Sequence, residues 1–209
     1  FVDGFNLYHS LEETLALHKY KWLNLRSLVE QFLTTTETLE EVQYFTAYTE
    51  WNQERKGRHT AYVGALRSTR VQITFGQFLE KERKSFVLCN NPCKTALAGQ
   101  KCGKPFLVHE EKKTDVNIAV AILRACVENR CDAIYLLSGD NDLIPALETG
   151  HALFPKKNFR VILPINAKAN AIKETCKKNG FKHLGIQEKH LQAAQFPKTV
   201  VFGEKIFTC

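Results

Sequence analysis

The sequence contains no methionine and no apolar run that could cross a membrane. A membrane-spanning helix needs about 20 consecutive apolar residues, and no stretch here approaches that length. The first residues also lack the pattern of a secretory signal peptide. The chain opens at Phe1, in what looks like the end of a strand, so we expect further residues before it in the native protein. We expect no membrane partner.

The seven cysteines form no pattern of disulfide pairs. Their number is odd, and Cys126, Cys131, Cys176 and Cys209 show no spacing that suggests pairing. Disulfide frameworks are typical of oxidising compartments, and free cysteines are typical of reducing ones. The cysteine usage therefore predicts a cytoplasmic protein.

The composition is that of an ordinary water-soluble domain. The 209 residues are 44% hydrophobic and 24% charged, which suits one α/β domain with a sizeable core. The 29 basic and 22 acidic residues give a formal charge of +7. A basic excess suits a polyanion such as nucleic acid, although many enzymes with other substrates are equally basic.

Strand-like and helix-like runs alternate along most of the chain. The expected strands are 1–2, 41–49, 71–75, 133–137, 160–163 and 181–184, and the expected helices are 6–19, 25–33, 51–67, 114–129, 143–153 and 167–178. This alternation predicts an α/β fold with a mainly parallel central sheet and helices on both faces. We expect a domain over residues 1–193, with residues 194–209 as a C-terminal extension.

The helix predicted at 114–129 has the clearest helical periodicity in the sequence. An apolar stripe recurs along it at helical spacing, made of Val116, Ala119, Val120, Leu123 and Val127. A stripe of this kind is typical of the core-facing side of a helix. We therefore expect these five side chains to be buried.

Residues 78–112 interrupt the alternation and are predicted to form a small Cys-rich and Lys-rich insertion, a hairpin or a knuckle. Within it, Cys89, Cys93, Cys102 and His109 resemble the ligands of a structural Zn²⁺ site. Thiolate and imidazole ligands suit tetrahedral zinc. The alternative is three free cysteines in a loop.

Polar side chains gather where the predicted strands end and a helix begins. Asp3 and Asn6 follow the first strand, Asp140 and Asp142 follow strand 133–137, and Asp115 opens helix 114–129. In an open parallel sheet these positions share one edge, where ligands usually bind. We expect the five side chains to meet there.

Several carboxylates in one cleft repel each other, and a divalent cation relieves the repulsion. Oxygen ligands favour Mg²⁺ or Mn²⁺ over zinc, and such a site can hydrolyse phosphodiesters. The acids other than Asp140 also have a simpler interpretation, and Asp140 is harder to explain in that way. Asp3 could be a turn residue, Asp115 could complement a helix dipole, and Asp142 could cap a helix.

Three blocks of sequence resemble the signature motifs of the NYN-domain family of PIN-like ribonucleases, often described as LabA-like. The blocks are Val2-Asp3-Gly4-Phe5-Asn6, Glu110-Glu111-Lys112-Lys113-Thr114-Asp115-Val116 and Leu137-Ser138-Gly139-Asp140-Asn141-Asp142-Leu143. The resemblance covers residues 1 to about 185. It implies a PIN-like three-layer α/β/α sandwich, a Mg²⁺ or Mn²⁺ site and endoribonuclease activity.

The resemblance also assigns roles to single residues. Asp3, Asp115 and Asp140 would be the core metal ligands, and Asn6 and Asp142 would support the metal, its waters or the phosphate. PIN-type sites usually have a fourth acid. Asp142 is the first choice for it here, and Glu111 is the second.

Basic and aromatic residues are candidates for contacts with RNA. The phosphate-binding candidates are Arg55, Lys56, Arg58, Lys94, Lys112 and Lys113, with Lys81, Arg83, Lys84, Lys101 and Lys104 in the same insertion. For any single lysine, a solvated surface position is the simpler interpretation. Trp51 and Phe78 are open between base stacking and packing, and we expect Phe75 to pack in the core.

The sequence thus favours a metal-dependent endoribonuclease that prefers single-stranded RNA. The first alternative is a non-catalytic RNA-binding or regulatory module on the same fold. The second is a nucleotide-sugar or phosphate-transfer enzyme, although no Gly-rich phosphate loop supports it. The oligomeric state stays open, with a homodimer among the alternatives.

Overall fold

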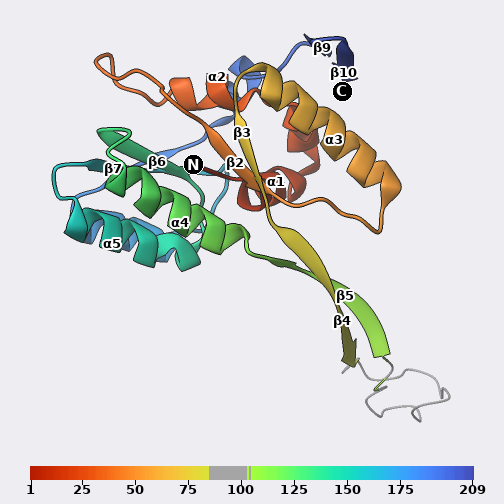
Figure 1. The fold of residues 1–209 in the computed structure, drawn as a ribbon, viewed down its shortest axis with the longest axis horizontal. Coiled ribbons are helices and arrows are strands. Elements are labelled where there is room, and N and C mark those ends of the chain that lie inside the picture. The colour runs from red at the N-terminus through yellow and green to blue at the C-terminus, as the bar shows by residue number, and fades with distance from the viewer. Residues whose placement is uncertain (85–102, 104) are drawn as a thin grey trace.

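The computed structural model describes residues 1–84, 103 and 105–209 (Figure 1). Its centre is a six-stranded sheet with the strand order β3-β2-β1-β6-β7-β8, and all neighbouring strands are parallel. The strands are β1 (Val2–Asp3), β2 (Gln43–Thr46), β3 (Gln72–Phe75), β6 (Ala133–Leu137), β7 (Asn158–Leu163) and β8 (Lys182–Gly185). The predicted parallel α/β fold is confirmed.

Helices cover both faces of the sheet and define two hydrophobic cores. One core is formed with α1 (Gly4–Glu12), the 3-10 helix η1 (Leu15–Tyr20), α2 (Leu25–Glu30), α3 (Gln53–Ser68) and α7 (Glu188–Ala193). The other is formed with α4 (Thr114–Val127), α5 (Ile144–Leu153) and α6 (Asn170–Asn179). The arrangement is the predicted three-layer sandwich.

The central strands are apolar at successive positions because both faces of the sheet are covered. On β6, Leu137 belongs to the core with α1, and its neighbour Leu136 belongs to the core with α4. Tyr44 and Phe45 divide in the same way on β2. Successive strand side chains point to opposite faces, so a strand buried on both sides needs a continuous apolar run.

The helix expected at 6–19 is divided in two. Helix α1 ends at Glu12, and η1 starts at Leu15 after Thr14 takes an extended conformation with φ −124° and ψ 116°. Thr14 is β-branched, a side-chain type that loses rotamer freedom in a helix. The single-helix prediction for this segment is therefore wrong.

The predicted burial of the apolar stripe of α4 is wrong for three of its five residues, whereas Ala119 and Leu123 are half-buried. Val116 and Val120 are 65% and 58% exposed, and Val127 is also exposed. The buried residues are Thr114, Ile118, Ile122, Ala125 and Cys126. Both sides of α4 carry apolar residues, so periodicity finds the helix but does not select the side that packs.

The first and last parts of the insertion are the strands β4 (Gln77–Lys84) and β5 (Pro105–Lys112), which pair as a hairpin. The two strands are antiparallel and project away from the body of the domain (Figure 1). The zinc prediction concerns Cys89, Cys93 and Cys102, which lie outside the described residues, as does Lys94. The zinc site and the phosphate-binding role of Lys94 therefore stay predictions.

The C-terminal segment folds back onto the domain. Strands β9 (Thr199–Phe202) and β10 (Lys205–Thr208) form a second antiparallel hairpin beside α3. Phe196 and Val200 join the core with α1, and the Trp22 indole donates to the Pro197 carbonyl at 2.8 Å. None of the helices in the described ranges combines the length and apolar character that crossing a membrane requires.

Candidate metal centre

Three carboxylates converge at one edge of the central sheet. Asp3 ends β1, Asp140 follows β6, and Asp115 lies in the first turn of α4. One carboxylate oxygen from each lies within 4.8 Å of the others. Strands β1 and β6 are parallel neighbours, with Val2 opposite Leu137, so their carboxyl ends meet at the same edge. The predicted convergence of these three acids agrees with the structure.

Asp3 is the most buried of the three, with 3% of its surface exposed. One carboxylate oxygen accepts the backbone N–H of Asn6 at 3.0 Å, which caps α1. The other accepts the hydroxyl of Ser138 at 2.8 Å. Burial raises the pKa of Asp3, the two hydrogen bonds partly offset this, and the charge of Asp140 raises it further. The side chain is thus fixed in place before any ligand arrives.

Hydrogen bonds also join the two loops that carry Asp3 and Asp140. The Ser138 hydroxyl accepts the N–H of Asp140 at 3.0 Å, and the Asn6 amide oxygen accepts the N–H of Gly139 at 2.8 Å. Asn6 therefore lies at the site as predicted, and its side-chain oxygen holds the loop after β6. The sequence analysis assigned no role to Ser138.

Asp115 has a pKa raised to about 6. Burial is the largest cause, followed by the charges of Asp3 and Asp140 and then those of Glu111 and Asp142. A helix N-terminus acting alone would stabilise the charged form and lower this pKa. Repulsion and desolvation outweigh the helix dipole, so the cluster favours a proton or a cation.

The two candidates for a fourth acid lie next to the cluster. Asp142 is exposed within the 3-10 helix η2 (Asn141–Leu143), and its N–H donates to Asp140 at 3.0 Å, so Asp140 is the capping residue. Glu111 on β5 accepts the N–H of Thr114 at 3.1 Å. It thereby caps α4, because Lys113, at φ 79°, offers no side-chain cap.

Most of the predicted phosphate-binding residues already have polar partners. Lys56 pairs with Glu50, and Arg58 pairs with Glu54. Lys112 lies 3.2 Å from Glu110, and the Lys113 ammonium donates to Gln77 at 3.0 Å. Arg55 is exposed near the start of α3. These contacts are on the surface, where ion pairs are weak enough to exchange for phosphate.

Aromatic side chains gather where the hairpin meets the domain. Trp51 stacks on His109 with ring centroids 3.5 Å apart, and Phe78 meets Trp51 edge-on at 4.8 Å. His109 Nε2 also lies 3.2 Å from Glu80. Phe75 stacks on Tyr48 at 4.7 Å but is itself exposed, so its predicted core position is wrong. It ends an edge strand, where nothing in the described part of the chain covers it fully.

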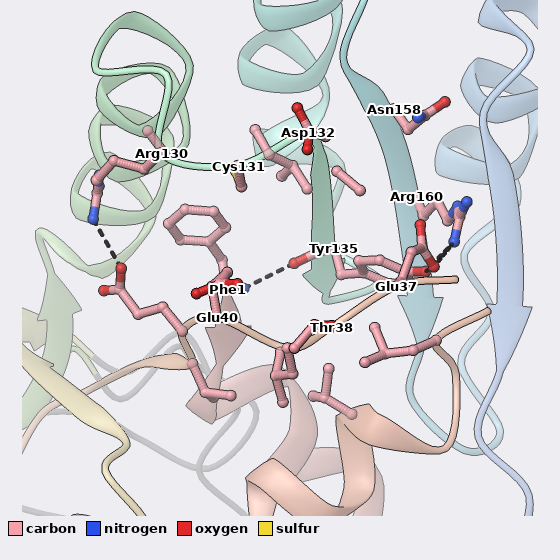
Figure 2. Close-up of a pocket in the computed structure, with 18 of the residues that line it drawn as sticks. Phe1, Glu37, Thr38, Glu40, Arg130, Cys131, Asp132, Tyr135, Asn158 and Arg160 are labelled. Carbon is pink, nitrogen blue, oxygen red and sulfur yellow. Dashed lines mark hydrogen bonds and ion pairs between the residues drawn. The ribbon is translucent and has the colours of Figure 1, made fainter. Parts of the chain in front are cut away.

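A cavity of about 620 Å³ lies at the amino-terminal ends of the central strands, opposite the carboxylate cluster (Figure 2). Its walls include Phe1, Tyr135 and Arg160, near the amino ends of β1, β6 and β7. Glu37 accepts hydrogen bonds from the Tyr135 hydroxyl and the Arg160 guanidinium, each at 2.7 Å. These polar groups satisfy one another, and the cavity takes no part in the carboxylate cluster.

The family of the chain follows from comparison with known proteins. The family model of the NYN domain matches residues 1–183, a range that contains all three clustered acids. The chain belongs to the NYN-domain family. This is a PIN-like nuclease family, and the central sheet with its flanking helices agrees with its fold.

Two further proteins are similar to this NYN-domain chain. It is 24% identical over 225 residues to the 6-hydroxy-3-succinoylpyridine 3-monooxygenase HspA of Pseudomonas putida (strain DSM 28022 / S16), covering 96% of this chain and 70% of that protein. A crystal structure of a protein of unknown function from Vibrio parahaemolyticus RIMD 2210633 superposes with a TM-score of 0.52. It is 14% identical and covers 90% of both chains, which shows a common fold.

Proposed function

We propose that this NYN-domain protein is a metal-dependent endoribonuclease that hydrolyses phosphodiester bonds in single-stranded RNA. The observation that carries the proposal is the convergence of Asp3, Asp115 and Asp140 within 4.8 Å at the carboxyl edge of the sheet. The nuclease character of the family supports RNA as the substrate class. The free cysteines Cys126, Cys131, Cys176 and Cys209 support a reducing compartment, the cytoplasm.

The three carboxylates fit a hard divalent cation. They offer oxygen atoms alone, the donor type that Mg²⁺ and Mn²⁺ prefer. The raised pKa of Asp115 reflects burial and repulsion that a cation would relieve. A bound cation would supply Lewis-acid polarisation of a phosphate oxygen and would lower the pKa of a water molecule.

The residues of the chain prepare this chemistry by fixing the acids. Ser138 and the Asn6 backbone hold Asp3 in one orientation, and Ser138 also holds the Asp140 backbone. Hydrogen bonds of this kind, made to the residues that would bind the metal, orient the ligand side chains and tune their basicity. In this proposal Asp142, which is exposed beside Asp140, supports the metal, its waters or the phosphate.

A covalently closed circle of single-stranded RNA tests the proposal. The circle has no ends, so an endonuclease linearises it and an exonuclease does not. We expect linear product with Mn²⁺ and none with chelator.

Two other outcomes would redirect the account. An intact circle that the protein retards in a gel, with or without metal, would indicate the non-catalytic RNA-binding module. An intact circle with no retardation would overturn the RNA proposal. The name of the Pseudomonas relative, which denotes oxygenation of a substituted pyridine, would then be the next activity to assay.

A further inference from the structure

The β4–β5 hairpin separates its charges between two faces. Its register places Lys81 opposite Val108 and Arg83 opposite Phe106. Residues directly opposite share a face, and successive residues alternate between faces.

One face, here called the basic face, carries the cations Lys81, Arg83 and Lys112 and the carboxylate of Glu110, a net charge of +2. The other carries Glu80, Glu82, Glu111 and Lys84, a net charge of −2.

The cations of the basic face share a single carboxylate. Lys112 Nζ lies 3.2 Å and Lys81 Nζ 3.9 Å from Glu110, and Arg83 pairs with the same side chain. The hydrogen bond from Arg83 is the largest cause of the lowered pKa of Glu110. One carboxylate cannot neutralise three cations, and ion pairs at such exposure are weak. The face therefore keeps a positive charge that a polyanion can use.

Exposed apolar side chains lie among these cations. Phe106 is 47% exposed and stands opposite Arg83, and Leu79 is 48% exposed and stands opposite Glu110. Single-stranded nucleic acids are bound by aromatic rings that stack on bases, set among cations that contact phosphates. The basic face offers both groups on one surface.

At the base of the hairpin, the other face meets the body of the domain. Phe78 on that face contacts Phe5 with ring centroids 5.5 Å apart, and His109 stacks on Trp51. Glu111 is occupied as the cap of α4. These contacts orient the base of the hairpin, and within the described part of the chain Lys81, Arg83 and Lys112 on the basic face are exposed.

We propose that the basic face of the β4–β5 hairpin binds single-stranded RNA and leads it to the carboxylate cluster. The inference rests on the proposed function and assigns it a substrate-binding surface. Strand β5 ends at Lys112, three residues before Asp115. A strand of eight residues spans about 26 Å, long enough to contact several consecutive phosphates.

Binding of a fluorescent single-stranded RNA, followed by anisotropy in chelator, separates this inference from catalysis. The test variant is Lys81→Gln with Arg83→Gln. The matched control is Lys198→Gln with Lys205→Gln, which removes the same charge from exposed positions of the C-terminal segment. We expect the test variant to weaken binding about tenfold or more near physiological salt, because two phosphate contacts are lost. It should also reduce the slope of log K against log salt by about 1.4, the value for two lost phosphate contacts on a single strand.

Phe106→Ala adds an independent readout. It should weaken binding about fivefold or more by loss of stacking, with the salt slope unchanged. Equal losses in the test and control variants would overturn the proposal, because charge alone would then explain binding. If the wild-type protein cuts RNA and the test variant binds RNA with unchanged affinity, the proposed binding surface is wrong and the proposed function still stands. Wild type that neither binds nor cuts RNA would refute the proposed function itself.

Discussion

The hydroxyl of Ser138 donates to the carboxylate of Asp3 at 2.8 Å, across a separation of 135 residues. The same hydroxyl accepts the N–H of Asp140, so one side chain aligns two of the three acids. Ser138→Ala should therefore weaken Mn²⁺ binding about 10- to 100-fold, the usual cost of losing an outer hydrogen bond to a ligand. Isothermal titration calorimetry with Mn²⁺ measures this.

The control for Ser138→Ala is Ser10→Ala. Ser10 is also buried, and its hydroxyl donates to the Leu7 carbonyl within α1, away from the acids. Mn²⁺ affinity should be unchanged in this control. If both variants lost affinity equally, the effect would come from general loosening of the fold and the role of Ser138 would be wrong.

The raised pKa of Asp115 makes the metal-free protein sensitive to pH. A carboxyl whose pKa is higher in the folded protein than in the unfolded chain destabilises the fold when it ionises. The free energy of unfolding should therefore fall as the pH rises from about 4, the pKa of an unfolded aspartate, through about 6, the pKa of folded Asp115.

Asp115→Asn tests this interpretation at pH 7.5. The substitution removes one charge from the repelling cluster, so Tm in chelator should rise relative to wild type. It also removes a predicted ligand, so the increase in Tm on adding Mn²⁺ should become much smaller. A lower Tm in chelator would show that Asp115 stabilises the metal-free fold, against this account.

Replacing Gly4 or Gly57 with alanine should change the free energy of unfolding in opposite directions. A Cβ at Gly4 would lie 2.5 Å from the Phe45 carbonyl oxygen and 2.7 Å from the Tyr44 ring. Such overpacking should lower the free energy of unfolding by about 1–3 kcal/mol. A Cβ at Gly57, inside α3, meets nothing within 4 Å. Gly57→Ala should raise it by about 0.5–1 kcal/mol through helix propensity.

Urea denaturation of both glycine variants measures these changes. Gly4 opens α1 directly after Asp3, so its close approach to β2 also helps to fix the position of that acid. If Gly4→Ala were as stable as wild type, the contact between the start of α1 and β2 would be looser than described.

The sequence predicted the strands and the convergence of the acids because both follow from local rules. Residues 133–137 form a continuous apolar run, and a run buried on both faces has few alternatives to a central parallel strand. Once β1 and β6 are parallel neighbours, Asp3 and Asp140 must share an edge. Gly180 ends α6 at φ 72°, a left-handed conformation that glycine adopts at helix C-termini.

Features that depend on tertiary contacts were not predictable in the same way. The buried side of α4 is chosen by the sheet beneath it, since Val120 and Ile122 are both apolar and only packing separates them. In the sequence Ser138 is an ordinary residue before Gly139, and its link to Asp3 appears only when β1 and β6 pair. The charged faces of the hairpin required its register, which the sequence did not supply.

The most direct test of the central claim compares two aspartates at opposite ends of one strand. Asp140 follows β6 within the cluster, whereas Asp132 is exposed and precedes the same strand at the far edge. The rate of RNA cleavage should be measured across a Mn²⁺ titration for Asp140→Asn and Asp132→Asn. The account predicts a loss of more than about 100-fold in the first, beyond that of an outer hydrogen bond, and wild-type rates in the second. Cleavage by Asp140→Asn at the wild-type rate and with the same Mn²⁺ dependence would contradict it.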